Sequence, residues 1–355
     1  MKGIGLVFSG GGGKGAYEIG VWKYLHENGL DNYVKSISGT SVGALNAALF
    51  VGSNIEKAED MWVNIAPSKI FSPKKYSAKD IENWLIENDL DISNLTTKIM
   101  SKTAAASIWP VKTISELLLL KFNNDHFFTR EGLSEMIEES INYNALQSSD
   151  IPCFSTCVKL PLFRIERFKL NDYLPDEILT ILLASSAMPL IFPKEEFKGK
   201  KYYDGGLPLG GDNTPIRPVY DTDVENIIVV HLNRETLIDK SEFPNSNIIE
   251  IVPSVDLGNV IKGTLDFTPE GAKRRIEIGY NDAKKVFQPM IEMLFMYFEN
   301  QKNLADLKKA MAQFDKERRE LLQREAELKN KMANDGFDDL HSKIIRRNKN
   351  DRIIK

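Results

Sequence analysis

A serine with a glycine two positions to either side is the strongest chemical signal in the sequence: residues 39–43 read Gly-Thr-Ser-Val-Gly. In a G-x-S-x-G nucleophile elbow, the small residues Gly39 and Gly43 let the chain turn sharply enough to expose the serine hydroxyl. A short strand-like segment, residues 33–38, precedes the motif, and an apolar helix-like segment, residues 42–52, follows it. Because this strand–turn–helix context is the one that the motif requires, we interpret Ser41 as a nucleophile.

A glycine-rich stretch, residues 9–15, follows the first predicted strand and reads Ser-Gly-Gly-Gly-Gly-Lys-Gly. A phosphate loop of the Walker type is excluded, since position 8 is Phe where that loop needs its first glycine and Lys14 is not followed by Ser or Thr. Three of the glycines also fit a dinucleotide fingerprint. That fingerprint expects an acidic residue at the end of the next strand, and the serine motif stands there instead.

The same stretch suits the stabilisation of negative charge beside the serine. It leaves the carboxyl end of a strand that is expected to neighbour the elbow, and consecutive glycines can point their N–H groups into one concavity. We therefore predict an oxyanion hole that also draws on the first helical N–H after the serine. Its predicted donors are Gly11, Gly12, Gly13 and Val42, and its predicted supporting residues are Gly10, Lys14 and Gly15.

A nucleophilic serine needs a base, and the better candidate is Asp204, which ends a strand-like segment and is followed by Gly205 and Gly206. A carboxyl group with a pKa near 4 is a poor base, but partial burial would raise that pKa. Among the histidines, only His231 ends a predicted strand, and it is the alternative. The two cysteines, Cys153 and Cys157, are interpreted as buried free thiols, and no metal site is predicted.

Alternating strand and helix patterns predict an α/β fold with a mostly parallel sheet. Helices are expected over about 16–28, 42–52 and 175–188. Strands are expected at residues 2–8, 33–38, 151–160, 162–170, 200–204, 225–233 and 247–253.

Length and composition indicate a globular protein. The chain has 355 residues, 42% of them hydrophobic, and a formal net charge of −4, which gives no sign of a nucleic-acid polymer as partner. No apolar run reaches the roughly 18 to 20 residues that a membrane-spanning helix needs. The N-terminus lacks the features of a signal peptide. We therefore expect a cytoplasmic protein.

The pattern divides into residues 1–295, with a helical cap inserted at about 55–150, and a charged helical extension over 296–355. In the extension, apolar residues recur every seven positions, while Arg318 and Glu325 interrupt the alternate seam. This imperfect heptad fits a helix packed on its own domain, a solvated helix or a homo-oligomer. The last fifteen residues hold six Lys or Arg against one Asp, which fits a disordered tail or contact with an anionic membrane.

Four ordered blocks resemble the patatin-like phospholipases: SGGGGKG, GTSVG, ASSAMPLIFP at residues 184–193, and DGG. The resemblance extends from about residue 3 to 215. It implies a three-layer α/β/α sandwich, a dyad of Ser41 and Asp204 without histidine, oxyanion donors in the glycine loop, a basic role for Lys14 and no cofactor. This chain departs from the family at position 13, where a non-glycine residue is usual, and this predicts a more mobile loop.

The resemblance implies hydrolysis of fatty-acyl ester bonds in phospholipids or lysophospholipids at a membrane surface that the protein contacts peripherally. Acyl transfer, cleavage of soluble acyl esters or thioesters, and a catalytically silent lipid-binding or storage role are the alternatives. Some bacterial relatives are antiphage effectors gated by a cyclic nucleotide that drives assembly, so an activator of this kind and a homo-oligomer are further expectations.

Overall fold

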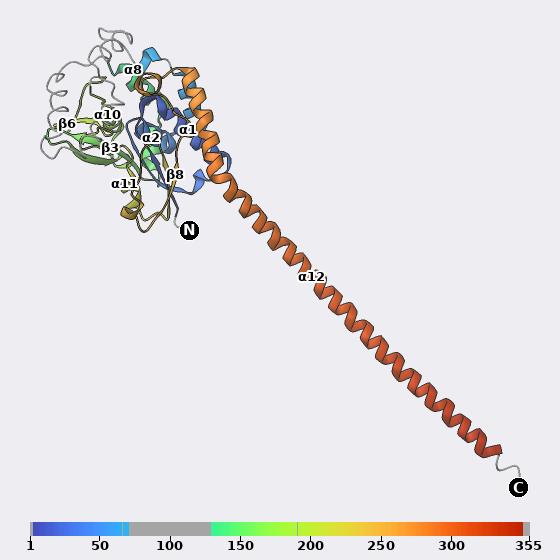
Figure 1. The fold of residues 1–355 in the computed structure, drawn as a ribbon. Coiled ribbons are helices and arrows are strands. Elements are labelled where there is room, and N and C mark those ends of the chain that lie inside the picture. The colour runs from blue at the N-terminus through green and yellow to red at the C-terminus, as the bar shows by residue number, and fades with distance from the viewer. Residues whose placement is uncertain (1–2, 66, 71–128, 190, 351–355) are drawn as a thin grey trace, which may run out of the picture. The chain divides into compact units, whose positions relative to one another are not determined.

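One mixed sheet forms the centre of the protein in the computed structural model, which describes residues 3–65, 67–70, 129–189 and 191–350. Within those residues eight strands pair in the order β5-β6-β3-β2-β1-β7-β8, with β4 also paired to β3 (Figure 1). The five strands from β3 to β8 in this order run parallel. Strands β4, β5 and β6 add antiparallel pairs at one side.

The first fifty residues form the predicted strand–helix–strand–helix unit. Its elements are β1 (Ile4–Phe8), α1 (Ala16–Glu27), β2 (Val34–Thr40) and α2 (Val42–Gly52). Gly29 has a φ of +67°, which fits the predicted stop of the first helix. Nearly every residue of β1 and β2 is buried, as expected for parallel strands with helices on both faces. The predicted three-layer α/β/α architecture is confirmed.

The later predicted strands are also present. They are β3 (Cys153–Lys159), β4 (Arg164–Lys169), β6 (Lys200–Asp204), β7 (Asn226–Val230) and β8 (Asn247–Ile251). The predicted helix over 175–188 is α10 (Pro175–Ser185). Several short elements were not predicted, among them β5 (Glu195–Phe197), α11 (Ile216–Tyr220) and a π-helical turn, η5 (Val260–Thr264). Elements this short carry too few residues for a periodic pattern.

Helices also occupy the described ends of the predicted cap. They are α3 (Ile55–Asn64), α4 (Pro67–Ile70), α8 (Glu131–Ser140) and α9 (Tyr143–Ser148). The central part of the predicted cap, residues 71–128, lies outside the described residues.

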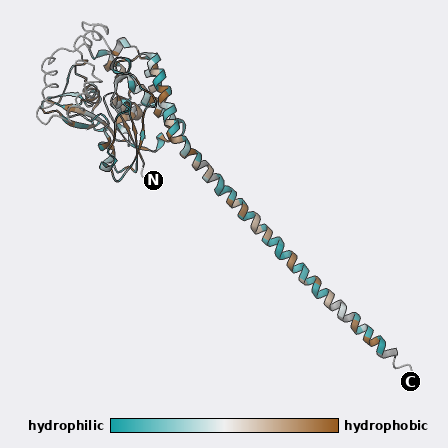
Figure 2. Ribbon diagram, in the orientation of Figure 1, coloured by the Kyte–Doolittle hydropathy of each residue, from teal (hydrophilic) through white to brown (hydrophobic). Residues whose placement is uncertain are grey.

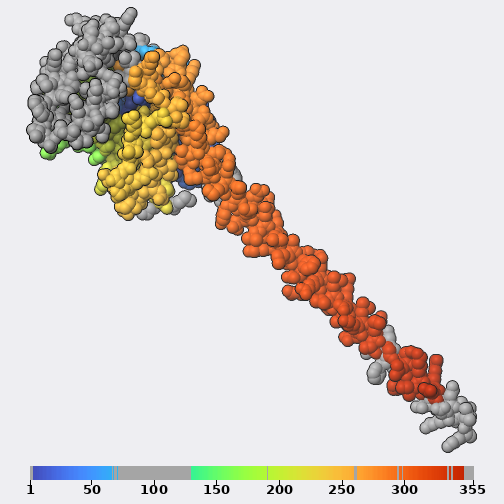
Figure 3. Space-filling model, in the orientation of Figure 1, coloured from blue at the N-terminus to red at the C-terminus, as the bar shows by residue number. Residues whose placement is uncertain are grey.

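The last helix, α12 (Pro269–Asn350), begins in a compact unit of residues 1–287 and continues through a second unit, residues 288–355. Within the first unit its Asp282 accepts a hydrogen bond from the buried Tyr17 hydroxyl at 3.2 Å. In the second unit the described side chains lie on the surface, and polar and apolar residues mix along the helix (Figures 2 and 3). Because the helix continues to Asn350, the first part of the basic segment, residues 341–350, is helical and does not form the disordered tail. Cations in a last helical turn interact favourably with the helix dipole.

Among the described residues, no helix is long and apolar enough to cross a membrane. The two cysteines are buried and unpaired, as predicted.

Candidate active site

The site forms where β2 and β6 meet end to end along one edge of β3. Thr40, the last residue of β2, pairs with Thr156 of β3. Asp204, the last residue of β6, pairs with Cys157, the next residue of β3. Because Ser41 directly follows Thr40, this register brings the serine and the aspartate together. The Ser41 Oγ donates a hydrogen bond to Asp204 Oδ2 at 2.7 Å.

The turn at Ser41 has the strained backbone of a nucleophile elbow. Its φ of 56° and ψ of −126° are dihedral angles that residues with a Cβ rarely adopt. The two flanking glycines permit close packing of the turn. A Cβ on Gly39 would overlap the carbonyl group of Gly43, and a Cβ on Gly43 would overlap that of Phe8. The G-x-S-x-G spacing therefore follows from the space available on both sides of the serine.

Asp204 is suited to act as a base near neutral pH. Its side chain is only 4% exposed, and burial raises its pKa from 3.8 to about 6. The hydrogen bonds from Ser41 and from the Gly206 N–H, the latter at 2.7 Å, and the charge of Arg130 act in the opposite direction. Gly205 directs its N–H to the Ser185 carbonyl at 3.2 Å. The carboxylate is therefore ionised at pH 7 and still basic enough to accept a proton.

The glycine loop lies beside the serine. Its outer N–H groups are engaged: Gly10 donates to the Asn213 carbonyl at 3.0 Å and Lys14 donates to the Gly11 carbonyl at 3.3 Å. The N–H groups of Gly11, Gly12 and Gly13 lie between them, at the start of the short helix η1 (Gly12–Gly15). N–H groups at a helix start have no partner within the helix, so these are the donors that remain for an anion.

The other predicted loop residues adjoin these donors. The N–H of Val42 opens α2 directly after the serine, where the helix dipole also favours negative charge. The Gly15 carbonyl accepts a hydrogen bond from the Asn46 side chain at 3.0 Å. Burial lowers the pKa of Lys14, while the neighbouring Asp256 acts to raise it.

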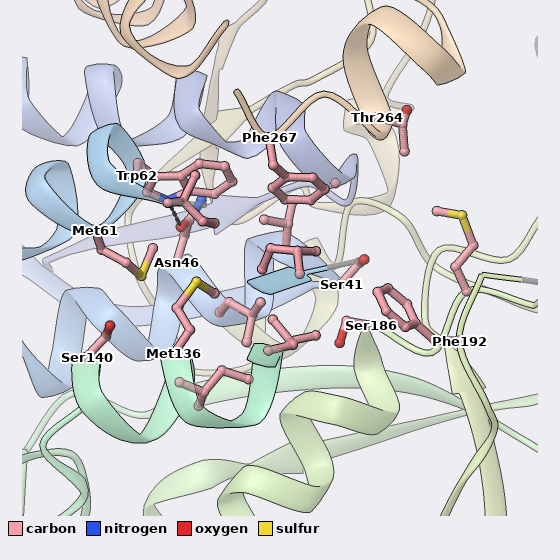
Figure 4. Close-up of a pocket in the computed structure, with 18 of the residues that line it drawn as sticks. Ser41, Asn46, Met61, Trp62, Met136, Ser140, Ser186, Phe192, Thr264 and Phe267 are labelled. Carbon is pink, nitrogen blue, oxygen red and sulfur yellow. Dashed lines mark hydrogen bonds between the residues drawn. The ribbon is translucent and has the colours of Figure 1, made fainter. Parts of the chain in front are cut away.

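An apolar pocket leads away from the serine. In Figure 4 Ser41 lies at one side of the pocket and Met61 and Met136 lie at the other. Trp62 stacks on Phe267 with 6.1 Å between ring centroids. Further apolar lining comes from Leu45, Leu49, Ile65, Leu133 and Ile137.

The alternative base, His231, is engaged elsewhere. Its side chain is 1% exposed, and its Nε2 pairs with Glu250 at 3.0 Å on the neighbouring strand β8. Burial lowers the pKa of this histidine. It does not line the pocket described above. Among the described residues, no group of His, Cys, Asp and Glu side chains could hold a metal ion.

Sequence reasoning did not identify two residues that lie next to Ser41 and Asp204. Ser185 accepts a hydrogen bond from the Ser41 N–H at 2.9 Å, and its hydroxyl donates to the Thr156 carbonyl at 2.7 Å. Arg130 is buried near Asp204 and donates to Ser186 at 3.3 Å. Ser185 falls inside the ASSAMPLIFP block, which offered a signal, whereas Arg130 belongs to no motif.

Comparisons with known proteins agree with this fold. A family model described as patatin-like phospholipase matches residues 6–220. No curated protein matches the chain. Among solved structures, the chain is similar to VipD from Legionella pneumophila, with 17% identity and a TM-score of 0.47 over 81% of this chain and 67% of that one.

Two further solved structures are similar. One is the type III effector ExoU from Pseudomonas aeruginosa, with 18% identity and a TM-score of 0.42 over 81% of this chain and 53% of that one. The other is human GIVD cytosolic phospholipase A2, with 10% identity and a TM-score of 0.38 over 82% of this chain and 58% of that one. The chain therefore spans between about half and two thirds of these three proteins.

The family model covers more than half of the chain, so the chain belongs to the patatin-like phospholipase family.

Proposed function

We propose that the protein hydrolyses fatty-acyl ester bonds of phospholipids or lysophospholipids, with Ser41 as nucleophile and Asp204 as general base. The observation that carries the proposal is the buried 2.7 Å hydrogen bond between these two side chains at an apolar pocket. The pocket offers a place for an acyl chain, and the dyad lies where the ester carbonyl of that chain would come.

The reaction proceeds in two halves. Ser41 Oγ attacks the ester carbonyl while Asp204 accepts its proton, and the carbonyl oxygen becomes an oxyanion. The N–H groups of Gly11, Gly12 and Gly13, with that of Val42, stabilise this charge. Asp204 then returns the proton to the leaving alcohol.

The second half releases the fatty acid. Asp204 takes a proton from a water molecule, which attacks the acyl-enzyme through a second oxyanion. The proton then passes to Ser41 as the bond to the acyl group breaks. Each half of the reaction needs the carboxylate ionised at its start, which its pKa of about 6 allows at pH 7.

The test compares wild type with Ser41→Ala and Asp204→Asn, measuring by mass spectrometry the fatty acids and lysolipids released from mixed phospholipid vesicles. Ser241→Ala, at an exposed position in the short helix η4 (Lys240–Glu242), is the matched control. We expect both site variants to lose at least about 10³-fold in rate and the control to keep full activity. Full activity in either site variant would refute the dyad.

The same experiment separates the alternatives. Cleavage of a soluble acyl ester or thioester without release from vesicles would favour the esterase or thioesterase reading, and acyl products on added alcohols would favour a transferase. A catalytically silent lipid-binding protein would leave Ser41 unlabelled by a fluorophosphonate probe.

We further propose that the protein is cytoplasmic, works at a phospholipid surface, and forms a homo-oligomer through residues 288–355. Apolar side chains exposed at seven-residue intervals along that helix support the last point: Leu307, Phe314, Leu321 and Leu328. A cyclic-nucleotide activator and a role in antiphage defence stay predictions from the resemblance. Lipid hydrolysis measured with and without cyclic dinucleotides tests them, and full activity without ligand would count against gating.

A further inference from the structure

Arg275, in the second turn of α12, is the largest of the side chains that are fully buried among the described residues, with 0% exposure. It lies outside residues 6–220, the part of the chain that the family model matches. A buried guanidinium is costly unless it is paired and fully hydrogen-bonded. Its burial therefore requires an ion-pair partner and a full set of hydrogen-bond acceptors.

All five N–H donors of this guanidinium have an acceptor. Nη2 donates to Asp266 Oδ2 at 2.7 Å, which also pairs the charge, and to the Lys262 carbonyl at 2.8 Å. Nη1 donates to the Asp266 carbonyl at 2.9 Å and to the Gly13 carbonyl at 3.3 Å. Nε donates to the Leu257 carbonyl at 3.4 Å. Four of these five bonds hold residues 257–266, and the fifth reaches the glycine loop.

The segment held by Arg275 packs directly on the glycine loop. A Cβ on Gly13 would overlap the carbonyl groups of Asp266 and Gly263, and a Cβ on Gly12 would overlap that of Thr264. This explains why glycine stands at position 13, where the family usually has another residue. The consecutive glycines of this loop have no side chains that could hold their backbone in place. The backbone conformation of the loop therefore depends on these contacts.

The same segment forms part of the pocket wall. Thr264, Leu265 and Phe267 line the pocket, and Figure 4 shows Phe267 beside Trp62. One buried side chain is thus bonded both to the segment that carries Thr264 and Leu265 of the pocket lining and to the loop of the proposed oxyanion donors.

We propose that Arg275 is a positioning residue that holds the glycine loop with the N–H groups of Gly11, Gly12 and Gly13 directed at the reacting carbonyl. The inference rests on the proposed function and adds to it a residue from the C-terminal helix. Because the peptide group is planar, the bond to the Gly13 carbonyl fixes the orientation of the peptide group between Gly13 and Lys14. The peptide group that carries the Gly13 N–H is the preceding one, and it joins this fixed group at the Gly13 Cα. Donors fixed in advance need no reorganisation when the oxyanion forms.

Lysine cannot replace this arginine. An ammonium has three donors at a single point, whereas the guanidinium reaches acceptors on both sides of a rigid fork. Arg275→Lys therefore keeps the charge and loses the geometry.

The experiment measures kcat and KM for hydrolysis of p-nitrophenyl butyrate, a soluble ester, by wild type and Arg275→Lys. We expect kcat to fall by about 10- to 100-fold, as for other losses of precise placement in the transition state. KM should stay within about threefold, because the loop acts on the transition state rather than on substrate binding. Amide exchange of residues 9–16, followed by mass spectrometry, should become faster in the variant.

Two controls separate positioning from stability. Arg274→Lys changes the exposed neighbour on the same helix and should match wild type in every readout. Tyr17→Phe removes the hydrogen bond to Asp282 on α12, so it should lower Tm while keeping kcat. If Arg275→Lys is insoluble, Asp266→Asn is measured in its place, since it removes the partner charge and retains the arginine. The same changes in kcat, KM and amide exchange are then expected.

A kcat within twofold of wild type, or unchanged exchange in residues 9–16, would overturn the proposal. So would an equal fall in kcat in Tyr17→Phe at an equal loss of Tm. The proposed function fails separately, if wild type shows no ester hydrolysis that depends on Ser41. In that case the amide exchange alone decides whether Arg275 orders the loop.

Discussion

Replacing Asp204 with asparagine should stabilise the protein while abolishing hydrolysis. The wild-type carboxyl is buried, and its pKa rises from 3.8 to about 6. This difference of roughly two pKa units, at about 1.36 kcal/mol each, corresponds to about 3 kcal/mol that the ionised group costs the folded state. Asparagine has nearly the same shape and can accept the hydrogen bond from the Gly206 N–H, but it carries no charge to desolvate.

The gain should depend on pH in a defined direction. A carboxyl group whose pKa is raised on folding binds its proton more tightly in the folded state, so its favourable contribution is complete below about pH 4. That contribution is lost as the pH rises through about 6. Asp204→Asn should therefore match wild type near pH 4 and exceed it by about 3 kcal/mol at pH 8. The wild-type kcat/KM should fall as the pH drops through about 6, because the base becomes protonated.

Urea unfolding at both pH values, with the m-value checked for constancy, measures the difference. Asp221→Asn, which removes an exposed ion pair with Arg217, is the control and should change the free energy of unfolding by less than about 1 kcal/mol at either pH. An equal gain at both pH values would show that packing rather than charge is responsible. No gain at pH 8 would refute the reasoning about the buried carboxylate.

Two further predictions concern the neighbours of this carboxylate. Ser41→Gly should be more stable than Ser41→Ala by about 1 kcal/mol, since both lack the hydroxyl but only alanine keeps a Cβ at a positive φ. Thermal unfolding at pH 5 compares the two variants, and equal stability would argue against backbone strain at Ser41. Arg130→Gln should move the acidic limb of the pH–rate profile to higher pH, because the arginine charge lowers the pKa of Asp204; an unmoved limb would show that this charge does not act on the base.

Local patterns predicted most of the fold and the main chemical groups. The strand and helix at the elbow, the glycine loop and the strand ending in Asp204 each have a signal within about ten residues of sequence. The contact between Ser41 and Asp204 has no local signal, because it depends on β2 and β6 sharing one edge of β3. That pairing could be inferred only through the family resemblance.

Residues that act singly were not predicted. Arg130 directly precedes α8 and Arg275 lies near the start of α12. An arginine in such polar sequence usually faces solvent, and only the assembled structure shows that both are buried. The extent of α12 was also underestimated, since a basic segment fits a solvated helix as well as a disordered tail.

Because β2 and β6 meet on one edge of β3 but lie far apart in the sequence, the parts of the site are synthesised at different times. A chain emerges from the ribosome with its N-terminus first. Ser41 and the glycine loop therefore exist for some time without their partners, since Asp204 follows Ser41 by 163 positions and Arg275 follows Gly13 by 262. The nascent protein carries a serine with no base and a loop with no anchor. The serine, its aspartate and the anchored loop are thus present together only after nearly all of the first compact unit has been made.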